Sequence, residues 1–328
     1  MINVALLAGG YTGEYEVSLN SAKNIAANLD ANKYKVYTIL INRDRWFHEI
    51  ESDRFDIDKN DFSITINGEK IKFDFAFITI HGTPGEDGKM QGYLDMIGIP
   101  YNTCDATTSA ISMNKAYTKS IVNGIKGLHC ARSIQLHKKD FHDIPAIAAS
   151  LKFPLFVKPN NGGSSVGMSK VYKITGLSEA INKAFKEDDQ VLVEQFIEGR
   201  EFSIGIARIN GHIQVLPATE IKSTKDFFDY EAKYTPGASE EITPADIPGE
   251  KMLEISEIVT QAYMRLNCRG MVRIDFILLG ATNDFYFIEV NTTPGQSAAS
   301  LIPQQVRAAG MNVGEFYGAL IEGAIRKY

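Results

Sequence analysis

The sequence contains few cysteines, and their spacing follows no familiar pattern. Only Cys104, Cys130 and Cys268 occur among the 328 residues, and they lie far apart. A disulfide framework needs an even and closely spaced set, and a metal site needs ligands at short spacing. Neither pattern is present. The cysteine content therefore excludes a disulfide-stabilised secreted scaffold and predicts a protein of the reducing cytoplasm.

Long apolar runs and basic stripes are also missing. No stretch reaches the roughly 20 apolar residues that a transmembrane helix needs, so no membrane span is expected. The apolar segment 2–8 is too short for a signal peptide and lacks a basic flank, so it predicts a buried strand. The net charge of −6 and the pI near 5.6 argue against a general nucleic-acid-binding protein, although they leave room for a local phosphate pocket.

The composition is that of a globular protein with a sizeable core. Hydrophobic residues make up 44% and charged residues 23% of the chain, and 328 residues suggest two domains or three small ones. The first 103 residues alternate between strand and helix patterns, which predicts a parallel α/β sheet with ligands at the carboxyl ends of its strands. The expected strands are 2–8, 34–41, 73–80 and 99–101, and the expected helices are 17–29 and 88–97.

Two of those strand ends carry residues suited to ligand binding. The loop 9–16 is rich in glycine but lacks the G-x-G-x-x-G spacing of a dinucleotide site. Its Glu14, near the start of a predicted helix, would repel a phosphate and suit a ligand ammonium group. The loop 81–88 places His81 directly after a buried strand. A tight glycine turn and a structural histidine are the alternatives for these two loops.

The segment 104–187 contains two lysines and a loop rich in glycine and serine. A predicted helix at 105–124 contains Lys115, and a predicted strand ends at Lys158. The loop 159–167 that follows can fold its backbone N–H groups around phosphate oxygens. It does not end in Gly-Lys-Ser/Thr, so it is not a P-loop, and a flexible turn is the alternative. An inward lysine on a strand needs a partner, and a phosphate fits that need.

The remaining residues, 188–328, contain one long segment without a regular pattern. The segment 218–248 mixes aromatic and charged residues, which favours a functional lid over disorder. Around it, strands are expected at 191–197, 201–209 and 212–217, and helices at 249–266, 303–310 and 312–327.

The segment 271–297 carries the strongest chemical signal. Two alternating apolar runs flank a short turn at 280–284, which predicts an antiparallel hairpin. Placing the centre of the turn at Thr282 sets Arg273 opposite Asn291 and Asp275 opposite Glu289, all on one face. Opposed carboxylates are destabilising, so a divalent cation with oxygen ligands is the expected third partner. The alternatives are a carboxylate pair with a raised pKa, or one neutralised by Arg273. The other face is expected to pack against a core through Ile274, Phe276, Ile288 and Val290.

Together these features indicate nucleoside triphosphate chemistry without a P-loop. A metal site, two phosphate-binding lysines, a glycine-rich loop and a lid are the parts that phosphoryl transfer needs. The kinase signatures His-Arg-Asp and Asp-Phe-Gly are absent from the sequence.

The residues resemble the ATP-grasp superfamily and, within it, the D-alanine–D-alanine ligase family. The resemblance extends over essentially the whole chain, in eight segments in the family's order. They are GGYTGEYEVSLNS (9–21), HGTPGEDGKMQGYLDMIGIPY (81–101), MNKAYTK (113–119), VKPNNGGSSVGMSKV (157–171), VLVEQFIEGREF (191–202), DYEAKY (229–234), RIDF (273–276) and EVNTTPGQSAASLIP (289–303).

The resemblance implies a fold of mixed α/β and α+β class. An N-terminal Rossmann-like domain with a parallel sheet (1–103) would bind the first substrate. A central subdomain (104–187) and a C-terminal subdomain (188–328), the latter with the metal site and the lid, would enclose ATP in an ATP-grasp arrangement. ATP would phosphorylate the carboxylate of one D-alanine, and the amine of a second would attack the acyl phosphate. The dipeptide product would serve peptidoglycan precursor synthesis.

The resemblance also implies roles for individual residues. Magnesium or manganese, as two ions, would bind Asp275, Glu289 and Asn291. ATP would contact Lys115, Lys158, Ser165, Glu194, Gln195, Ile197 and Glu201. The substrates would contact Glu14, His81, Lys233, Ser300 and Leu301, and catalysis would involve Glu14, Ser164, Tyr234, Arg273 and the backbone N–H of Gly295.

The family pattern implies a cytoplasmic homodimer that uses D-alanine and ATP and has no nucleic-acid or membrane partner. The chain departs from the pattern at Asn114, at Gly163 and at 296–299, where Gln-Ser-Ala-Ala replaces the common Met-Thr-Ser-His. The last departure lies at the second subsite and leaves Ser300 in place. The alternatives are a ligase that takes D-lactate or D-serine as second substrate, another ATP-grasp carboxylate–amine ligase, and a non-catalytic ATP-binding regulatory protein.

Overall fold

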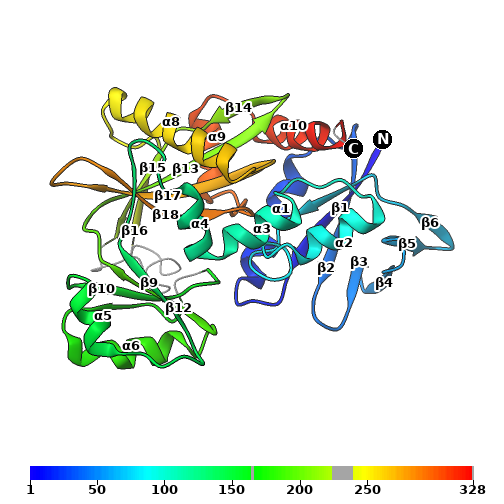
Figure 1. Cartoon of the computed structure of the whole chain (residues 1–328). Coiled ribbons are helices and arrows are strands. Elements are labelled where there is room, and N and C mark those ends of the chain that lie inside the picture. Colours follow the sequence, from blue (N-terminus) through cyan, green and yellow to red (C-terminus); the bar gives the residue numbers. More distant parts are fainter. Residues whose placement is uncertain (164–165, 224–238, 327–328) are drawn as a thin grey trace.

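The computed structural model of the chain describes residues 1–163, 166–223 and 239–326 (Figure 1). Within these ranges the strands form three sheets, of seven, four and seven strands. No helix of these ranges is both long and apolar enough to cross a lipid bilayer.

The first sheet combines parallel and antiparallel strands. In spatial order it consists of β6 (Glu69–Ile71), β5 (Ser63–Ile66), β4 (Asp53–Asp58), β3 (Trp46–Ile50), β2 (Tyr34–Ile41), β1 (Ile2–Gly9) and β7 (Phe75–Ile78). β1 pairs in parallel with β2 and β7, as the alternating pattern predicted. The four strands β3 to β6 continue the sheet in antiparallel fashion, which the prediction of a parallel sheet missed. The strand expected at 99–101 is a single bridge between Ala76 and Tyr101.

Helices from both ends of the chain cover the first sheet. α1 (Tyr15–Asn28) and α10 (Val313–Ile325) pack on one face, and α2 (Lys89–Ile97) packs on the other. Figure 1 shows α10 in red beside the blue β1, although the two elements come from opposite ends of the chain. The apolar side chains of β1 and β7 thus share a core with the C-terminal helices.

The predicted helix at 105–124 is two helices. α3 (Ala106–Met113) and α4 (Lys115–Val122) are separated at Asn114, which is extended with φ −92° and ψ 107°. The Asn114 side chain accepts a hydrogen bond from the backbone N–H of Tyr117 at 3.0 Å and so caps α4. Its backbone forms a bridge with Asn161. The prediction of one continuous helix was wrong here, because the bridge and the cap interrupt it.

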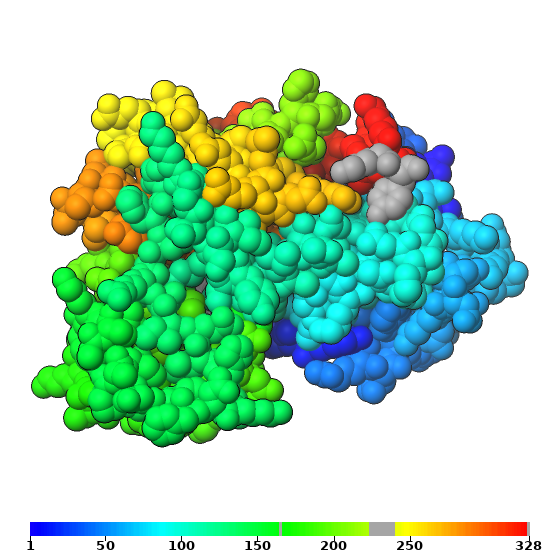
Figure 2. All heavy atoms as spheres, viewed as in Figure 1, coloured from blue at the N-terminus to red at the C-terminus, as the bar shows by residue number. Residues whose placement is uncertain are grey.

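The second sheet is antiparallel and forms a lobe with its own core. Its strands are β11 (Ser169–Val171), β10 (Leu155–Pro159), β12 (Gln190–Gln195) and β9 (Ser133–His137). The short helix η1 (Ile174–Gly176) and the helices α5 (Ile144–Ser150) and α6 (Leu177–Ala184) belong to the same lobe. Figure 2 shows this lobe in green, projecting from the body and separated by a recess from the blue N-terminal residues.

The third sheet contains the hairpin predicted from the sequence. In spatial order its strands are β16 (Ser239–Ile242), β15 (Thr219–Ser223), β13 (Gly199–Ile209), β17 (Met271–Leu279), β18 (Phe285–Asn291) and β8 (Leu128–Cys130), and β14 (His212–Val215) pairs with β13. α8 (Gly249–Arg265) and α4 share its core, and α9 (Leu301–Ala308) follows the hairpin. β15 and β16 lie in the segment 218–248, which was expected to lack regular structure. Its middle, 224–238, is outside the described ranges.

Candidate active site

A cavity of about 970 Å³ is lined by residues of the second and third sheets and by residues that follow strands β1 and β7 of the first sheet. Every predicted site residue within the described ranges lines this cavity. They are Glu14, His81, Lys115, Lys158, Glu194, Gln195, Ile197, Glu201, Arg273, Asp275, Glu289, Asn291, Gly295, Ser300 and Leu301. The other four predicted residues, Ser164, Ser165, Lys233 and Tyr234, fall outside the described ranges.

The hairpin of β17 and β18 has the predicted register at its acidic end. Arg273 lies opposite Asn291, and Asp275 lies opposite Glu289. β17 ends at Leu279 and β18 begins at Phe285, so the turn occupies the predicted residues 280–284. The sequence pattern thus placed both carboxylates on one face correctly.

A bulge changes the register beyond the acidic pair. It lies after Asp275, so that Phe276 pairs with Phe287 instead of Ile288. Phe287 takes the core position and is 4% exposed, whereas Ile288 is half-buried and lines the cavity. The prediction that Ile288 packs into the core was therefore wrong, because one extra residue in a bulge reorients the strand.

Asp275 accepts four hydrogen bonds from three residues. Its carboxylate accepts hydrogen bonds from Arg273 Nε at 2.9 Å and Arg273 Nη2 at 2.7 Å. Ser203 Oγ donates at 2.6 Å and Asn291 Nδ2 at 3.1 Å. Although burial opposes the guanidinium charge, the charge and hydrogen bonds of Asp275 raise the pKa of Arg273. Arg273 therefore neutralises Asp275. Neutralisation by Arg273 was one of the alternatives to a cation that the sequence left open for the acidic pair.

Glu289, the other member of the acidic pair, is held by a lysine from a different element. Lys115 Nζ lies 3.2 Å from Glu289 Oε2, and Lys115 is 6% exposed. Burial opposes the ionisation of Glu289, but the charges of Lys115, Arg273 and Lys158 outweigh it and lower the pKa of Glu289 to about 2. Glu289 is consequently a carboxylate at neutral pH, with oxygens available as hard ligands.

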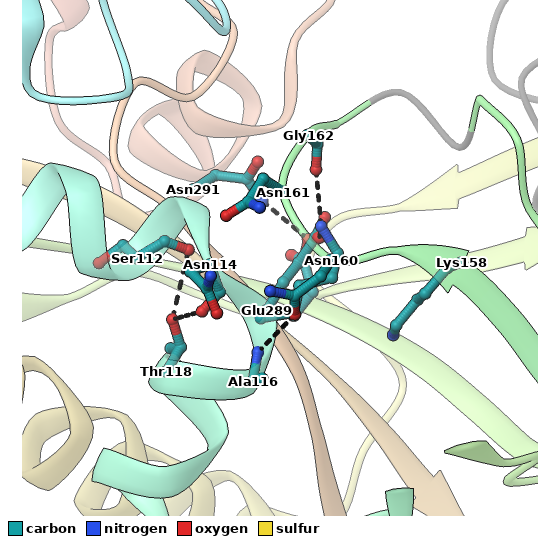
Figure 3. Close-up of polar contacts among 12 residues, drawn as sticks. Ser112, Asn114, Ala116, Thr118, Lys158, Asn160, Asn161, Gly162, Glu289 and Asn291 are labelled. Carbon is teal, nitrogen blue, oxygen red and sulfur yellow. Dashed lines mark hydrogen bonds and ion pairs between the residues drawn. The ribbon is translucent and has the colours of Figure 1, made fainter. Parts of the chain in front are cut away.

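Lys115 owes its position to the break between α3 and α4. Lys115 is the first residue of α4, where the helix dipole disfavours a positive charge. The Glu289 carboxylate and the Gly162 carbonyl, which lies 2.6 Å from Lys115 Nζ, offset this unfavourable interaction. Asn160 joins the same helix end to the base of the glycine-rich loop. Its side-chain oxygen accepts from the backbone N–H of Ala116 at 2.9 Å (Figure 3). Its backbone carbonyl accepts from the backbone N–H of Lys115 at 3.0 Å.

Lys158 is paired with a carboxylate of the predicted adenine hinge. Its Nζ lies 2.5 Å from Glu194 Oε1, and Lys119 Nζ lies 2.9 Å from Glu194 Oε2. Lys119 also donates to the Ala131 carbonyl at 2.8 Å. Burial opposes the charge of Glu194, but the two lysines lower its pKa. The sequence predicted that a buried Lys158 needs a partner, and that partner is Glu194. The group of Lys158, Lys119 and Glu194 has two positive charges and one negative charge.

Aromatic side chains line the cavity beside this group. The rings of Phe156 and Phe196 lie 6.2 Å apart, and Lys170 Nζ lies 3.9 Å from the centre of the Phe196 ring. Gln195, the last residue of β12, and Ile197 flank Phe196. An apolar wall with carboxylate and backbone groups at its edge suits a flat, polar-edged ring system.

The carboxyl ends of β1 and β7 contribute the acidic end of the cavity. Thr12 joins the two predicted loops, because its Oγ1 donates to the His81 carbonyl at 3.1 Å and accepts from the Glu14 N–H at 3.4 Å. His81 is buried, with 7% exposure. The two loops thus bring the Glu14 carboxylate and the His81 imidazole to the same cavity.

Glu86 is a cavity residue that sequence reasoning missed. It accepts from the backbone N–H of Gly82 at 3.0 Å and from that of Thr293 at 3.4 Å. Burial raises its pKa to about 7, and the charges of Glu14 and Glu289 add to this effect. Its position in the same loop as His81 was the sequence feature that could have identified it.

Lys119 was also missed, although it lies one helical turn after Lys115 on α4.

The loop between β18 and α9 also lines the cavity. Ser300 occupies the N-cap position of α9 without a capping bond from its side chain, and its Oγ accepts instead from the backbone N–H of Ser297 at 3.0 Å. A side chain on Gly295 would have its Cβ 2.9 Å from Ser300 Oγ, so only glycine fits there without displacement. Gly295 and Leu301 both line the cavity.

Comparisons with known proteins agree on one family. The sequence profile described as "D-ala D-ala ligase N-terminus" matches residues 3–104, and "D-ala D-ala ligase C-terminus" matches residues 125–322. The chain is 44% identical to a D-alanine–D-alanine ligase from Flavobacterium johnsoniae, over 98% of this chain and 99% of that protein.

Two solved structures resemble the whole chain. One is the VanG D-Ala:D-Ser ligase from Enterococcus faecalis, with a TM-score of 0.88, 31% identity and coverage of 99% of both chains. The other is the D-alanyl-alanine synthetase A from Vibrio cholerae, with a TM-score of 0.88, 28% identity and coverage of 99% of this chain and 98% of that one. The profiles, the sequence identity and the shared ATP-grasp fold show that the chain belongs to the D-alanine–D-alanine ligase family.

Proposed function

We propose that the protein joins two D-alanine molecules into D-alanyl-D-alanine at the expense of ATP, for peptidoglycan precursor synthesis. The observation that carries this proposal is the meeting of phosphate-suited lysines, an acidic hairpin and an ammonium-suited carboxylate in one cavity. A carboxylate oxygen of the first D-alanine attacks the γ-phosphorus of ATP, and ADP leaves. The amine of the second D-alanine then attacks the acyl carbon, and phosphate leaves.

The ATP end of the site is assigned to the second sheet and α4. Lys115 and Lys158 neutralise phosphate charge, with the backbone around Ser165. Glu194 accepts from the base, and its two lysines keep it ionised for that purpose. Gln195 and Ile197 supply hinge contacts, and Glu201 binds the ribose.

The donors at the hairpin fit a magnesium or manganese site. Asp275, Glu289 and Asn291 offer the oxygen ligands that hard cations prefer, and Glu289 is ionised at neutral pH. Within the described ranges no group of three His, Cys, Asp or Glu forms a metal site on its own, so phosphate oxygens would complete the coordination. We therefore assign these three residues to two ions, which would supply charge neutralisation at the phosphates.

The substrate end of the site is assigned to the loops of the first sheet and to the loop before α9. Glu14 binds the ammonium group of the first D-alanine, with His81 beside it. Ser300, the backbone of Leu301 and Lys233 hold the carboxylate of the second. Arg273 and the Gly295 N–H stabilise the oxyanion, and Ser164 and Tyr234 link with Glu14 when the lid shuts.

At the level of organisation we propose a cytoplasmic homodimer. The domains would be 1–103, 104–187 and 188–328, with the lid at 218–248. All three cysteines are free thiols that form no disulfide, which suits the reducing cytoplasm.

Phosphate release tests the proposal directly. Purified protein with ATP, magnesium and D-alanine should release phosphate and form the dipeptide in equal amounts, and chelation of the metal should stop both. If well-folded protein releases no phosphate in response to D-alanine, the proposal fails.

Because the structure resembles a D-Ala:D-Ser ligase, the same assay should also test which second substrate the protein uses. D-serine or D-lactate should replace the second D-alanine poorly when each competes with D-alanine at neutral pH. Products resolved by mass decide the matter. A dominant mixed product would show that the alternative specificity is correct.

A further inference from the structure

Gln296 lies directly behind the cavity wall that Pro294 and Gly295 form. Pro294 and Gly295 line the cavity, whereas Gln296 is 2% exposed and its side chain contacts α10 and β17. Buried amides are expensive unless their hydrogen bonds are satisfied. The partners of Gln296 therefore reveal what the residue holds in place.

The side-chain amide of Gln296 connects the cavity wall to the protein core. Its Nε2 donates to the carbonyl of Pro294 at 2.9 Å and contacts Met271 Sδ at 3.4 Å. Its Oε1 accepts from the hydroxyl of Tyr317 at 3.0 Å. Tyr317 is completely buried on α10 and packs edge-on against Phe77 of β7, so this end of the connection is rigid.

The backbone of Gln296 is held from a third element. Its N–H donates to Ser21 Oγ at 3.0 Å, and its carbonyl accepts from Asn24 Nδ2 at 2.7 Å. Ser21 and Asn24 lie on adjacent turns of α1. Gln296 is thus tied to α1 through its backbone and to α10 through its side chain.

The bond to Pro294 has a specific geometric consequence. The carbonyl of Pro294 and the N–H of Gly295 belong to the same peptide unit, which is planar and, when trans, points the two groups in opposite directions. The cis peptide bonds of the described ranges lie elsewhere. A donor that fixes the Pro294 carbonyl therefore also fixes the direction of the Gly295 N–H.

We propose that Gln296 is a positioning residue that aims the Gly295 N–H at the oxyanion of the ligation step. The inference rests on the proposed function, in which that N–H stabilises developing negative charge. Gly295 has no side chain with which to fix its own peptide plane, so the restraint comes from its neighbour.

Kinetics of the Gln296→Leu variant test the proposal. Leucine keeps an apolar body of similar size but cannot donate to the Pro294 carbonyl. We expect kcat for dipeptide formation to fall by roughly tenfold or more, because small misplacements of catalytic groups are costly. The KM for ATP should stay within about twofold, since the ATP contacts lie on other elements.

Two further variants separate positioning from stability. Tyr317→Phe removes only the hydroxyl that holds the far end of the amide, so it should lower kcat less, and the double variant should be no worse than Gln296→Leu alone. Leu320→Ala creates a cavity in the same core on α10 without touching the network. It should lower stability and leave kcat unchanged.

The pH dependence of the activity of the Gln296→Glu variant distinguishes positioning from a purely structural role. A protonated glutamic acid can donate to the Pro294 carbonyl and an ionised one cannot. The activity of this variant relative to wild type should therefore rise as the pH is lowered.

Each result decides between named outcomes. Folded Gln296→Leu or Tyr317→Phe protein with wild-type kcat overturns the inference, and so does an equal kcat loss in Leu320→Ala. A wild-type protein without D-alanine-dependent phosphate release refutes the proposed function instead.

Discussion

The charged residues of the cavity depend on one another for their ionisation. Arg273 is bound twice by Asp275, and Glu289 is held ionised by Lys115 and Arg273 against the effect of burial. Removing one partner of a buried pair leaves the other uncompensated, so single substitutions here act on more than one group.

Replacing Arg273 tests its proposed catalytic role. Arg273→Ala should lower kcat by about two to three orders of magnitude, the usual cost of losing one oxyanion donor. Steady-state kinetics and a denaturant unfolding curve measure activity and fold separately. Arg208→Ala removes an arginine outside the cavity, which bonds the Gly211 carbonyl, and should leave kcat unchanged. Unchanged turnover in folded Arg273→Ala would contradict the oxyanion role.

Glu86 makes the stability of the protein depend on pH. Its pKa is raised from 4.5 to about 7, chiefly by burial, so the folded state holds a proton more tightly than the unfolded state. Its contribution to stability is therefore complete below about pH 4.5 and is lost as the pH rises to about 7. Between pH 5 and 8, Glu86→Gln should gain stability relative to wild type, by up to the order of 3 kcal/mol.

Chemical unfolding of both proteins across this range, without ligands, measures the difference. Asp87→Asn, next in the same loop and with its own lysine partner Lys89, serves as the charge-matched control. A stability difference between Glu86→Gln and wild type that does not change with pH would show that Glu86 keeps an ordinary pKa.

At the scale of elements, short interruptions place the functional groups. The break at Asn114 makes Lys115 the first residue of α4, and the bulge after Asp275 turns Ile288 toward the cavity. The break is accompanied by a bridge to the distant Asn161, and the bulge arises in the pairing of β17 with β18. Local helix or strand propensity carries no information about them.

The cap of α4 should contribute measurably to stability. Asn114→Ala removes the acceptor for the Tyr117 N–H and should lower the free energy of unfolding by about 1 kcal/mol. Asn114→Asp keeps an acceptor at the same position and should retain wild-type stability. Equal stability of the alanine variant in urea unfolding would show that the break is maintained by the bridge to Asn161 alone.

At the scale of the whole molecule, one apolar cluster joins the first and third sheets, and the cluster of the second sheet stands apart. The N-terminal strands and the C-terminal helices share one apolar cluster, which ties the first sheet to the third. The second sheet has a separate cluster formed entirely by its own lobe. The cavity lies between the lobe and the rest, so a ligand there contacts units that are packed independently.

ATP should therefore stabilise the whole protein. A ligand that binds only the folded state adds about 2.7 kcal/mol to the free energy of unfolding at one hundred times its Kd. Urea unfolding with and without magnesium ATP measures this gain. Inorganic phosphate at the same ionic strength should give a much smaller one. The absence of a shift at saturating ATP would argue against binding in this cavity.

The sequence alone determined the features that rest on local periodicity and motif spacing. Alternating apolar residues set the register of the hairpin at Asp275 and Glu289, since side chains two residues apart share a face. The parallel pairing of β1 with β2 and β7 followed from alternation of strands and helices. Ordered motifs were sufficient to identify the family and a set of residues that the fold brings to one cavity.

Only the tertiary structure decided which charged groups are partners. It paired Lys158 with Glu194, placed Lys119 on the same carboxylate, and raised the pKa of Glu86. It also showed that Gln296 links the cavity wall to Tyr317. These outcomes depend on burial and on distances between segments far apart in the chain, and electrostatic energies change steeply with both.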